Sequence, residues 1–139
     1  MREVPELENR KPSHPQRILV VEDSPLVRRC CVEILTRSGY QVDAAEDGLC
    51  GWAALCAKPY DLLITDNAMP NMSGVELILK LRSEHLKLPV ILTSGTLPLE
   101  NLLQDPQLDL AATLEKPVSA DQLIQTVRIV LKGNWSRMP

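Results

Sequence analysis

Five polar side chains stand at or just past the ends of four short apolar runs, and their types suit metal binding and phosphoryl transfer. They are Glu22, Asp23, Asp66, Ser94 and Lys116. Apolar runs of this length, separated by helical patterns, indicate parallel strands that are covered on both faces. Because ligands of open α/β sheets bind just outside the carboxyl ends of the strands, we expect these side chains to share one cleft.

Three carboxylates in one cleft would repel one another, so a divalent cation is their natural partner. Mg²⁺ prefers hard oxygen ligands and is the cofactor that we expect. Asp66 is placed to attack phosphorus and form an aspartyl-phosphate, while the metal and the Lys116 ammonium neutralise the phosphoryl oxygens. The Ser94 hydroxyl could then hydrogen-bond the bound group, and Gly95 leaves room beside it.

The segments between the apolar runs predict the helices that position these side chains. Caps or helical patterns place helix starts near Pro25, Gly48, Gly74 and Ser119. The second helix carries Leu49, Ala53 and Cys56 as its apolar positions, and the third is expected to turn Val75, Ile78 and Leu79 inward. A fourth helix could begin at Pro98, but Pro106 would end or bend it, so it should be short or irregular. The fold class is therefore α/β, a doubly wound five-stranded parallel sheet with five helices.

Length and charge limit the classes of function. The 139 residues suffice for one domain, at about 17–132, between a disordered N-terminal tail at 1–16 and a C-terminal tail at 133–139. A net charge of −3 and a pI near 5.4 offer no basic stripe, so we expect no nucleic-acid partner. No apolar run is long enough to cross a bilayer, and the first residues lack the apolar core of a signal peptide. We expect a cytoplasmic protein.

The four cysteines form no recognisable metal or disulfide pattern. Cys30 and Cys31 are adjacent, and Cys50 and Cys56 fall within one helical pattern, so there is no CxxC pair and no histidine at ligand spacing. We expect reduced thiols that are buried or half-buried and act as small hydrophobes.

Four motifs, taken in order and spacing, resemble the receiver domain of two-component response regulators, with a likeness to chemotaxis-type regulators. They are ILVVEDSP at 18–25, DLLITDNAMPNMSG at 61–74, PVILTSG at 89–95, and Lys-Pro at 116–117. The resemblance covers about 17–132. It implies a flavodoxin-like sheet with the strand order 2-1-3-4-5, which the handedness of parallel connections also favours.

The resemblance also implies a role for each matching acidic position. Asp66 corresponds to the phosphoacceptor and Asp23 to a direct magnesium ligand. Glu22 corresponds to a second acidic residue that acts through a metal-bound water. Ala68 would contribute only its backbone carbonyl to the metal.

At the other two strand ends the resemblance implies that Ser94 is the switch hydroxyl and that Lys116 is the lysine of the site. The peptide bond to Pro117 is expected to be cis. A purely structural alternative is that Asp23 and Asp66 cap helices and that Lys116 forms an ion pair. That alternative leaves unexplained why all of these residues fall on one edge of the sheet.

The sequence departs from the usual receiver pattern in two respects, one that concerns the switch and the dimer and one that concerns the lifetime of the phosphorylated state. Thr113 stands where many receivers carry a Tyr or Phe that swings inward, and the chain has no Phe, so an aromatic switch is not expected. Pro98 and Pro106 disfavour the common dimer of the family, so we expect a monomer or a weak dimer through another face. Ala68 and Thr96 carry no acid or amide to orient a hydrolytic water, which predicts slow loss of the phosphate.

The sequence thus predicts a phosphorylation-dependent signalling switch rather than an enzyme, although a receiver can catalyse its own phosphorylation and dephosphorylation. The donor would be a histidine kinase or a histidine phosphotransfer protein, and output would pass to an unknown downstream protein. The resemblance implies that Arg28 and Arg29 lie near the contact with the donor, and the alternative that they are only a solvated basic pair stays open. Two alternatives stay open: a phosphorylation-independent scaffold, and a receiver excised from a hybrid histidine kinase. A nucleotide-binding enzyme is disfavoured, because neither GxxxxGK[ST] nor GxGxxG occurs.

Overall fold

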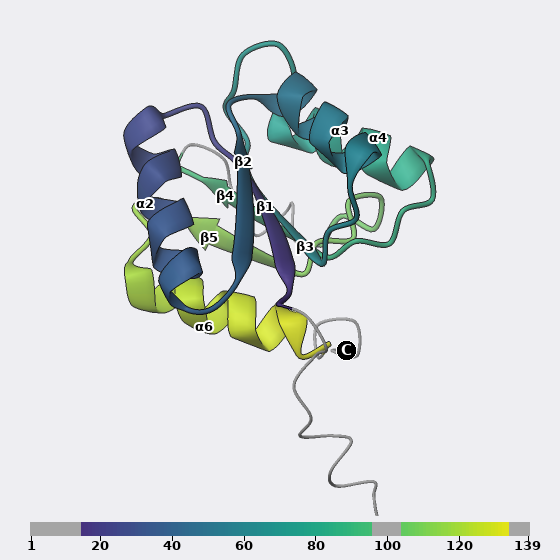
Figure 1. Ribbon diagram of the computed structural model, residues 1–139. Helices are drawn as coiled ribbons and strands as arrows, with labels where there is room; N and C mark the ends of the chain where they lie inside the picture. The colour runs from purple at the N-terminus through teal and green to yellow at the C-terminus, as the bar shows by residue number, and fades with distance from the viewer. Residues whose placement is uncertain (1–14, 96–103, 134–139) are drawn as a thin grey trace, which may run out of the picture.

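The computed structural model describes residues 15–95 and 104–133 and consists of one sheet with helices on both faces (Figure 1). The tails expected at 1–16 and 133–139 fall almost wholly outside these residues, as do Thr96 and the fourth-helix start at Pro98. The elements are β1 (Arg17–Val21), α2 (Pro25–Arg37), β2 (Gln41–Ala45), α3 (Gly48–Ala57), β3 (Leu62–Asp66), α4 (Gly74–Ser83), β4 (Val90–Ser94), β5 (Ala112–Glu115) and α6 (Ala120–Leu131).

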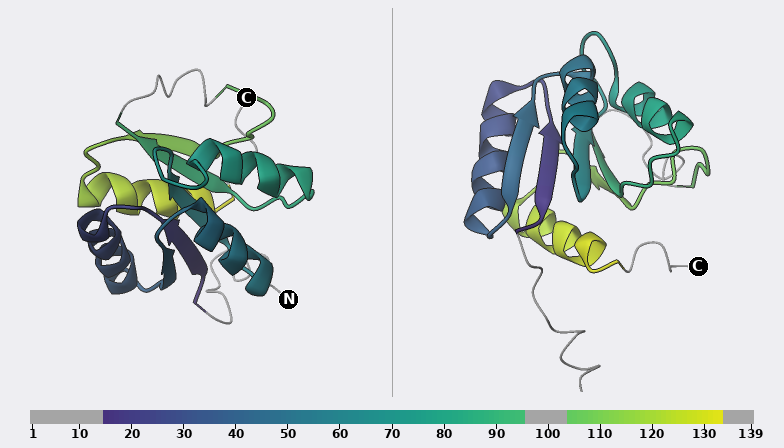
Figure 2. Two further views of the ribbon diagram at one scale, coloured as in Figure 1. Left: turned by 90° about the horizontal axis from the view of Figure 1, so that it is seen from above. Right: turned by 45° about the vertical axis from the view of Figure 1, so that its right-hand side comes forward.

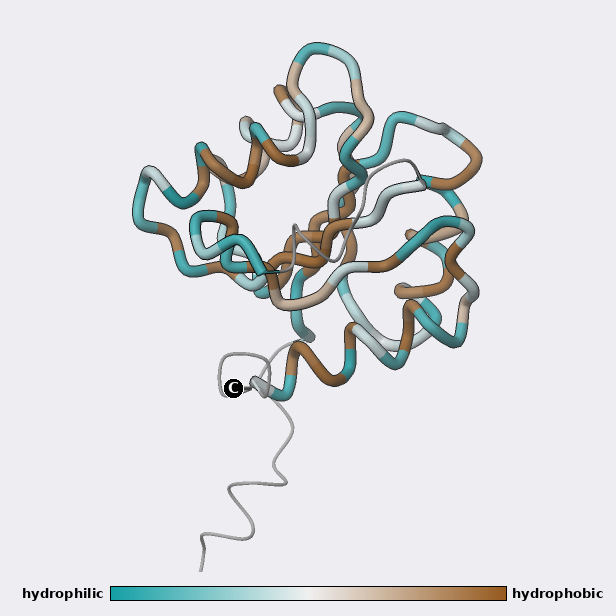
Figure 3. Tube along the Cα trace, turned by 180° about the vertical axis from the view of Figure 1, so that it is seen from behind, coloured by the Kyte–Doolittle hydropathy of each residue, from teal (hydrophilic) through white to brown (hydrophobic). Residues whose placement is uncertain are grey.

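The sheet is parallel throughout, with the order β2-β1-β3-β4-β5, as the sequence predicted. Helices α2 and α6 cover one face, and α3 and α4 lie side by side on the other (Figures 1 and 2). Successive residues of β1 serve the two faces alternately: Ile18 packs with Val127 of α6, whereas Leu19 packs with Leu77 of α4. The hydrophobic residues accordingly gather along the central strands (Figure 3).

The predicted helix starts are confirmed by their caps. The Ser24 hydroxyl accepts a hydrogen bond from the N–H of Val27, with Pro25 in the first turn of α2. Ser73 and Ser119 each form a capping box, with Glu76 and Gln122 respectively. Of the fourth helix, the described part after residue 103 contains turns and no helix, and it buries Leu108 and Leu110 against the core.

Helix α3 faces the sheet differently from the prediction. Leu49 is 52% exposed, and Ala53 and Cys56 are exposed as well. The side against the sheet instead contains Gly51, where an added Cβ would lie 2.9 Å from a methyl carbon of Val21. Because α3 has no polar side, its hydrophobic pattern does not predict which face packs against the sheet. The close approach that Gly51 allows determines the buried face.

Two smaller expectations are also corrected. In α4, Leu79 is 38% exposed, and Leu77, Ile78 and Leu81 are the residues that are fully buried. Of the cysteines only Cys31 is half-buried, whereas Cys30, Cys50 and Cys56 are exposed. Within the described residues, none of the helices combines the length and the apolar character that crossing a membrane requires.

Candidate functional site

Three carboxylates meet at the carboxyl ends of the adjacent strands β1 and β3. Glu22 and Asp23 directly follow β1, and Asp66 is the last residue of β3. One carboxylate oxygen from each of the three lies within 4.8 Å of the others. Glu22 and Asp66 are only 4% and 5% exposed, while Asp23 is open to solvent. The parallel pairing of the strands therefore brings together the acidic side chains that the sequence singled out.

Lys116 reaches this cluster from the end of β5. Its Nζ lies 2.9 Å from Oε1 of Glu22 and 3.3 Å from Oδ1 of Asp66. Its backbone N–H donates to the carbonyl of Ser94, and the following peptide bond to Pro117 is cis. The ammonium group thus bridges two buried carboxylates from strands that are far apart in the sequence.

Burial and charge oppose each other at these groups. Desolvation raises the pKa of both Glu22 and Asp66, and the neighbouring Lys116 offsets part of the rise. Burial by itself would lower the Lys116 pKa, but its hydrogen bond to Glu22 and the two carboxylate charges raise it overall. When all groups are ionised, three negative charges face one positive charge, so two negative charges remain without a partner inside the cluster. A divalent cation would balance them.

The loop after β1 is held by hydrogen bonds on both sides of Glu22. The second oxygen of Glu22, Oε2, accepts a hydrogen bond from the N–H of Ser24 at 3.1 Å. The Arg28 guanidinium donates to the backbone carbonyl of Glu22 at 2.8 Å. Arg28 is therefore a structural part of this loop, whereas its neighbour Arg29 is exposed.

The segment after Asp66 is held by two residues that the sequence analysis did not assign to the site. The Asn67 side-chain oxygen accepts from the N–H of Val75 in the first turn of α4, and the Asn67 carbonyl accepts from the N–H of Gly74. An added Cβ at Gly74 would lie 2.2 Å from the carbonyl oxygen of Asp66. Only glycine permits this approach. The signal was a glycine inside the first turn of a capped helix, close after a strand that ends in an acid.

A second connection joins this segment to α3. Asp47 caps α3, with one oxygen accepting from the N–H of Cys50 and the other from the side-chain amide of Asn71. These hydrogen bonds lower the Asp47 pKa. An added Cβ at Gly48 would lie 2.5 Å from the carbonyl oxygen of Met72. The loop between Asp66 and α4 is thus packed tightly against the first turn of α3.

The remaining predicted site residues lie around the cleft. Ser94 ends β4, is 1% exposed and pairs with Glu115 across the sheet. Ala68 is exposed two residues beyond Asp66. Thr113 lies half-buried within β5 opposite Leu92. Thr96 lies outside the described residues.

Comparison with known proteins assigns the chain to a family. The family model for the response regulator receiver domain matches residues 18–128. The chain is a member of this family. The CheY-like response regulator receiver domain protein from Methanospirillum hungatei JF-1 superposes with a TM-score of 0.80 at 26% identity, covering 89% of this chain and 99% of that one. The Francisella response regulator 1452 receiver domain gives a TM-score of 0.79 at 27% identity, with 86% and 98% covered.

Two curated relatives match this chain over one segment of a longer protein. The sensor histidine kinase RcsC of Salmonella typhi is 34% identical over 112 residues, which are 81% of this chain and 12% of that protein. The transcriptional regulatory protein CusR of Escherichia coli K12 is 29% identical over 116 residues, covering 84% and 51%. The chain therefore spans about half or less of the length of these relatives.

Membership places this receiver in two-component signalling. Receiver domains are phosphorylation-based signalling modules rather than enzymes in the usual sense, and they interact with histidine kinases or phosphotransfer proteins. They generally bind Mg²⁺ at an acidic pocket, and the cluster of Glu22, Asp23 and Asp66 is an acidic group of that kind.

Proposed function

We propose that this receiver is a signalling switch that accepts a phosphoryl group on Asp66 from a phosphohistidine donor. The observation that carries the proposal is a buried carboxylate with a lysine ammonium 3.3 Å away and two further carboxylates at metal-ligand distance. A carboxylate oxygen of Asp66 attacks phosphorus, the phosphorus–nitrogen bond breaks, and the imidazole leaves with the bonding pair. Lys116 helps to keep Asp66 ionised despite burial, and it can then neutralise a phosphoryl oxygen.

The donor set fits magnesium. The candidate ligands are all hard oxygens, from Asp23, Asp66 and the backbone carbonyl of Ala68, and Glu22 would act through a bound water. A divalent cation would also balance the two negative charges that Lys116 does not neutralise. When bound, Mg²⁺ would supply positive charge against the phosphoryl oxygens. Ser94 would hydrogen-bond the phosphoryl group and carry the switch, because Thr113 supplies no aromatic ring for it.

A groove beside the cleft supports a docking role for α2. It has a volume of about 500 Å³ and runs between α2 and the segment after Lys116. Its lining includes the apolar residues Leu26, which is 68% exposed, Val27 and Val118, together with Glu22 and Lys116 of the cleft. An apolar surface next to the phosphoacceptor suits the helix that presents the phosphohistidine, with the exposed Arg29 beside it.

A second candidate is that this receiver works within a hybrid histidine kinase, which the 34% identity to a sensor histidine kinase favours. Both versions place the domain in the cytoplasm, with output through contacts to a further protein. Both also predict a long-lived phosphorylated state, because Ala68 and Thr96 offer no acid or amide. The double variant Ala68→Asn/Thr96→Glu should lose phosphate faster than the natural protein, and an unchanged decay would refute the lifetime argument.

The decisive experiment is intact mass after incubation with Mg²⁺ and a small phosphodonor. We expect one added phosphoryl group that requires Mg²⁺ and is absent from Asp66→Asn. Asp61→Asn is the matched control, since Asp61 precedes the same strand at its opposite end and should leave phosphorylation intact. No addition with small donors or phosphohistidine proteins would leave a phosphorylation-independent scaffold as the better description.

A further inference from the structure

The outer face of α3 is apolar and exposed. Between Gly48 and Ala57 the helix contains no charged residue. Its exposed positions are Leu49, Cys50, Ala53, Cys56 and Ala57. By contrast, α2 exposes charged side chains such as Glu33 and Arg37, which form an i,i+4 ion pair. A helix that is apolar all round is normally buried on all sides, so this face is suited to contact with another protein.

The exposed residues of α3 are arranged symmetrically about Ala53. Cys50 and Cys56 lie three residues before and after it, and Leu49 and Ala57 lie four residues before and after it. At 3.6 residues per turn, Leu49 and Cys56 fall on one side of Ala53, and Cys50 and Ala57 fall on the other. An antiparallel copy related by a two-fold axis at Ala53 would therefore set Leu49 against Cys56, and Cys50 against Ala57. In each contact a larger side chain meets a smaller one, which lets the two helices approach closely.

Charge complementarity selects the same arrangement. The exposed Glu46 precedes α3, and Lys58, also exposed, follows its last residue. In an antiparallel pair the acidic end of each copy meets the basic end of the other, and the helix dipoles are opposed favourably. The Lys58 ammonium makes only a 3.4 Å contact with the half-exposed Asp43, so it can turn toward a second carboxylate at little cost.

We propose that the outer face of α3 is a self-association surface, on which a second copy of this chain docks antiparallel about a two-fold axis at Ala53. A helix of ten residues is about 15 Å long, so a pair of them buries less than the roughly 1,600 Å² of a standard stable interface. The dimer is accordingly weak. It goes beyond the proposed function, because self-association of the unphosphorylated chain requires no phosphoryl transfer.

Sedimentation of the full chain in reductant, from micromolar to millimolar concentration, tests this surface. The natural protein should self-associate reversibly, and Ala53→Glu should be monomeric throughout, because two glutamates would face each other at the axis. Ile129→Glu is the matched control, as it places the same charge at another exposed apolar position, on α6, and should associate normally. Circular dichroism establishes that each variant is folded. A natural protein that is monomeric throughout, or association lost in Ile129→Glu but kept in Ala53→Glu, would overturn the proposal.

A charge exchange distinguishes a second copy from other modes of association. Glu46→Lys and Lys58→Glu should each weaken the dimer about tenfold or more, which corresponds to about 1.4 kcal/mol, and the double variant should regain it. A double variant that associates no better than the single ones would contradict the antiparallel arrangement.

Cross-linking gives an independent readout of the same geometry. With Cys30 and Cys31 replaced by serine, a short bismaleimide should join two chains through Cys50 and Cys56. With Cys50 and Cys56 replaced instead, the exposed Cys30 should give no dimer. The reverse result would place the contact on α2 and refute the α3 surface.

Discussion

Lys116 at the carboxyl end of the sheet and Arg82 at its amino end are both partly buried cations, but they face different acceptors. Lys116 contacts two carboxylates, which are charged and which a metal could also bind. Arg82 donates instead to neutral backbone carbonyls, those of Leu86, Leu88, Leu108 and Asp109. The carboxylates around Lys116 can bind a ligand in place of the ammonium. The carbonyls around Arg82 carry no net charge, and the contacts of Arg82 hold two loops together.

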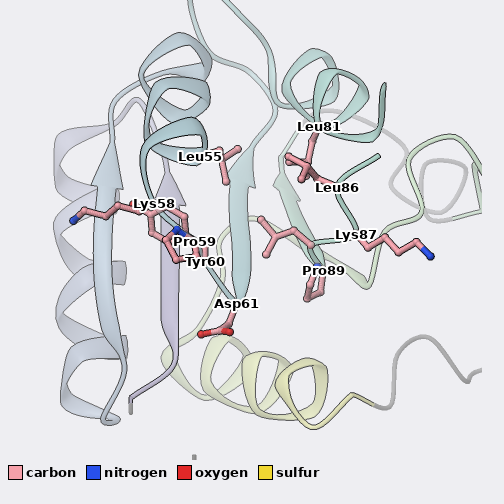
Figure 4. A pocket seen from close by; sticks show the side chains of 10 residues that line it. Leu55, Lys58, Pro59, Tyr60, Asp61, Leu81, Leu86, Lys87 and Pro89 are labelled. Carbon is pink, nitrogen blue, oxygen red and sulfur yellow. The ribbon is translucent and has the colours of Figure 1, made fainter. Parts of the chain in front are cut away.

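The other polar groups at the amino end also make contacts that hold the fold, although their partners include carboxylates. A pocket of about 410 Å³ lies there, and Lys58 and Lys87 at its rim extend away from it in opposite directions (Figure 4). The Asp61 carboxylate accepts the N–H of Arg17 at 2.8 Å, where β1 begins. The Tyr60 hydroxyl donates to Asp43 at 2.7 Å. A pocket with polar groups among its lining residues is thus not sufficient for a site. What distinguishes the carboxyl end is buried charge that the described side chains leave uncompensated.

The largest expected effect is a loss of stability when a side chain is added where the backbone is tightly packed at the carboxyl end of the sheet. Gly74→Ala should lower the free energy of unfolding by about 3 kcal/mol or more, because the new Cβ would lie 2.2 Å from the Asp66 carbonyl oxygen. Gly95→Ala at the same end should cost less than about 1 kcal/mol, since its Cβ would meet only Lys116 Cβ, at 3.6 Å. Chemical denaturation measures both, and equal losses would show that the close contact at Gly74 is not limiting.

Magnesium should sharpen the comparison. Mg²⁺ at a hundredfold excess over its dissociation constant should stabilise the natural protein by about 2.7 kcal/mol through linkage. Asp66→Asn should lose most of this response, and Asp61→Asn should keep it. Thermal unfolding with and without EDTA provides the measurement. A response that survives Asp66→Asn but is lost in Asp61→Asn would move the cation to the amino end.

Arg82→Lys tests whether the amino-end cation is structural. A lysine cannot span the four carbonyls that the planar guanidinium reaches, so stability should fall by about 2 kcal/mol. Phosphoryl uptake by the folded variant should be unchanged, whereas Lys116→Met should lose it. Denaturation and intact mass measure the two effects separately, and reduced uptake in Arg82→Lys would erase the distinction between the two ends.

The smallest effect concerns pH at the amino end. Burial and the hydrogen bond to Asp43 raise the pKa of Tyr60 to about 12. Because the folded state then holds the proton more tightly than the unfolded state, stability should decline as the pH rises from about 10 towards 12. Tyr60→Phe should remove this dependence and cost about 1 kcal/mol or less. The difference in tyrosinate absorbance between the natural protein and Tyr60→Phe follows the titration, and a Tyr60 that ionises near 10 would contradict it.

The sequence predicted the sheet and the acidic cluster because both depend on local signals. Uninterrupted apolar runs identified the strands, the caps at Ser24, Ser73 and Ser119 identified the helix starts, and parallel pairing then brought Glu22, Asp23 and Asp66 together. The geometry at the strand ends required no knowledge of side-chain packing.

What could not be predicted depends on contacts between elements. The buried face of α3 is set by how closely Gly51 approaches Val21, and a helix that is apolar on every side does not reveal this. The positions of Asn67 and Gly74 likewise follow from the distance between β3 and α4 rather than from their own preferences. Arg82 is a similar case, because its partners lie in loops without periodic pattern.

The hydrogen bond from the Asn71 side chain to Asp47 connects the loop after Asp66 to the first turn of α3. If a phosphoryl group on Asp66 displaced this loop, it would also strain or release the first turn of α3 and so change how readily two copies associate. Because the two equilibria are linked, dimerisation would change the equilibrium for phosphorylation of Asp66 by the same factor. Protein concentration would then act as a second input to the switch, alongside the kinase.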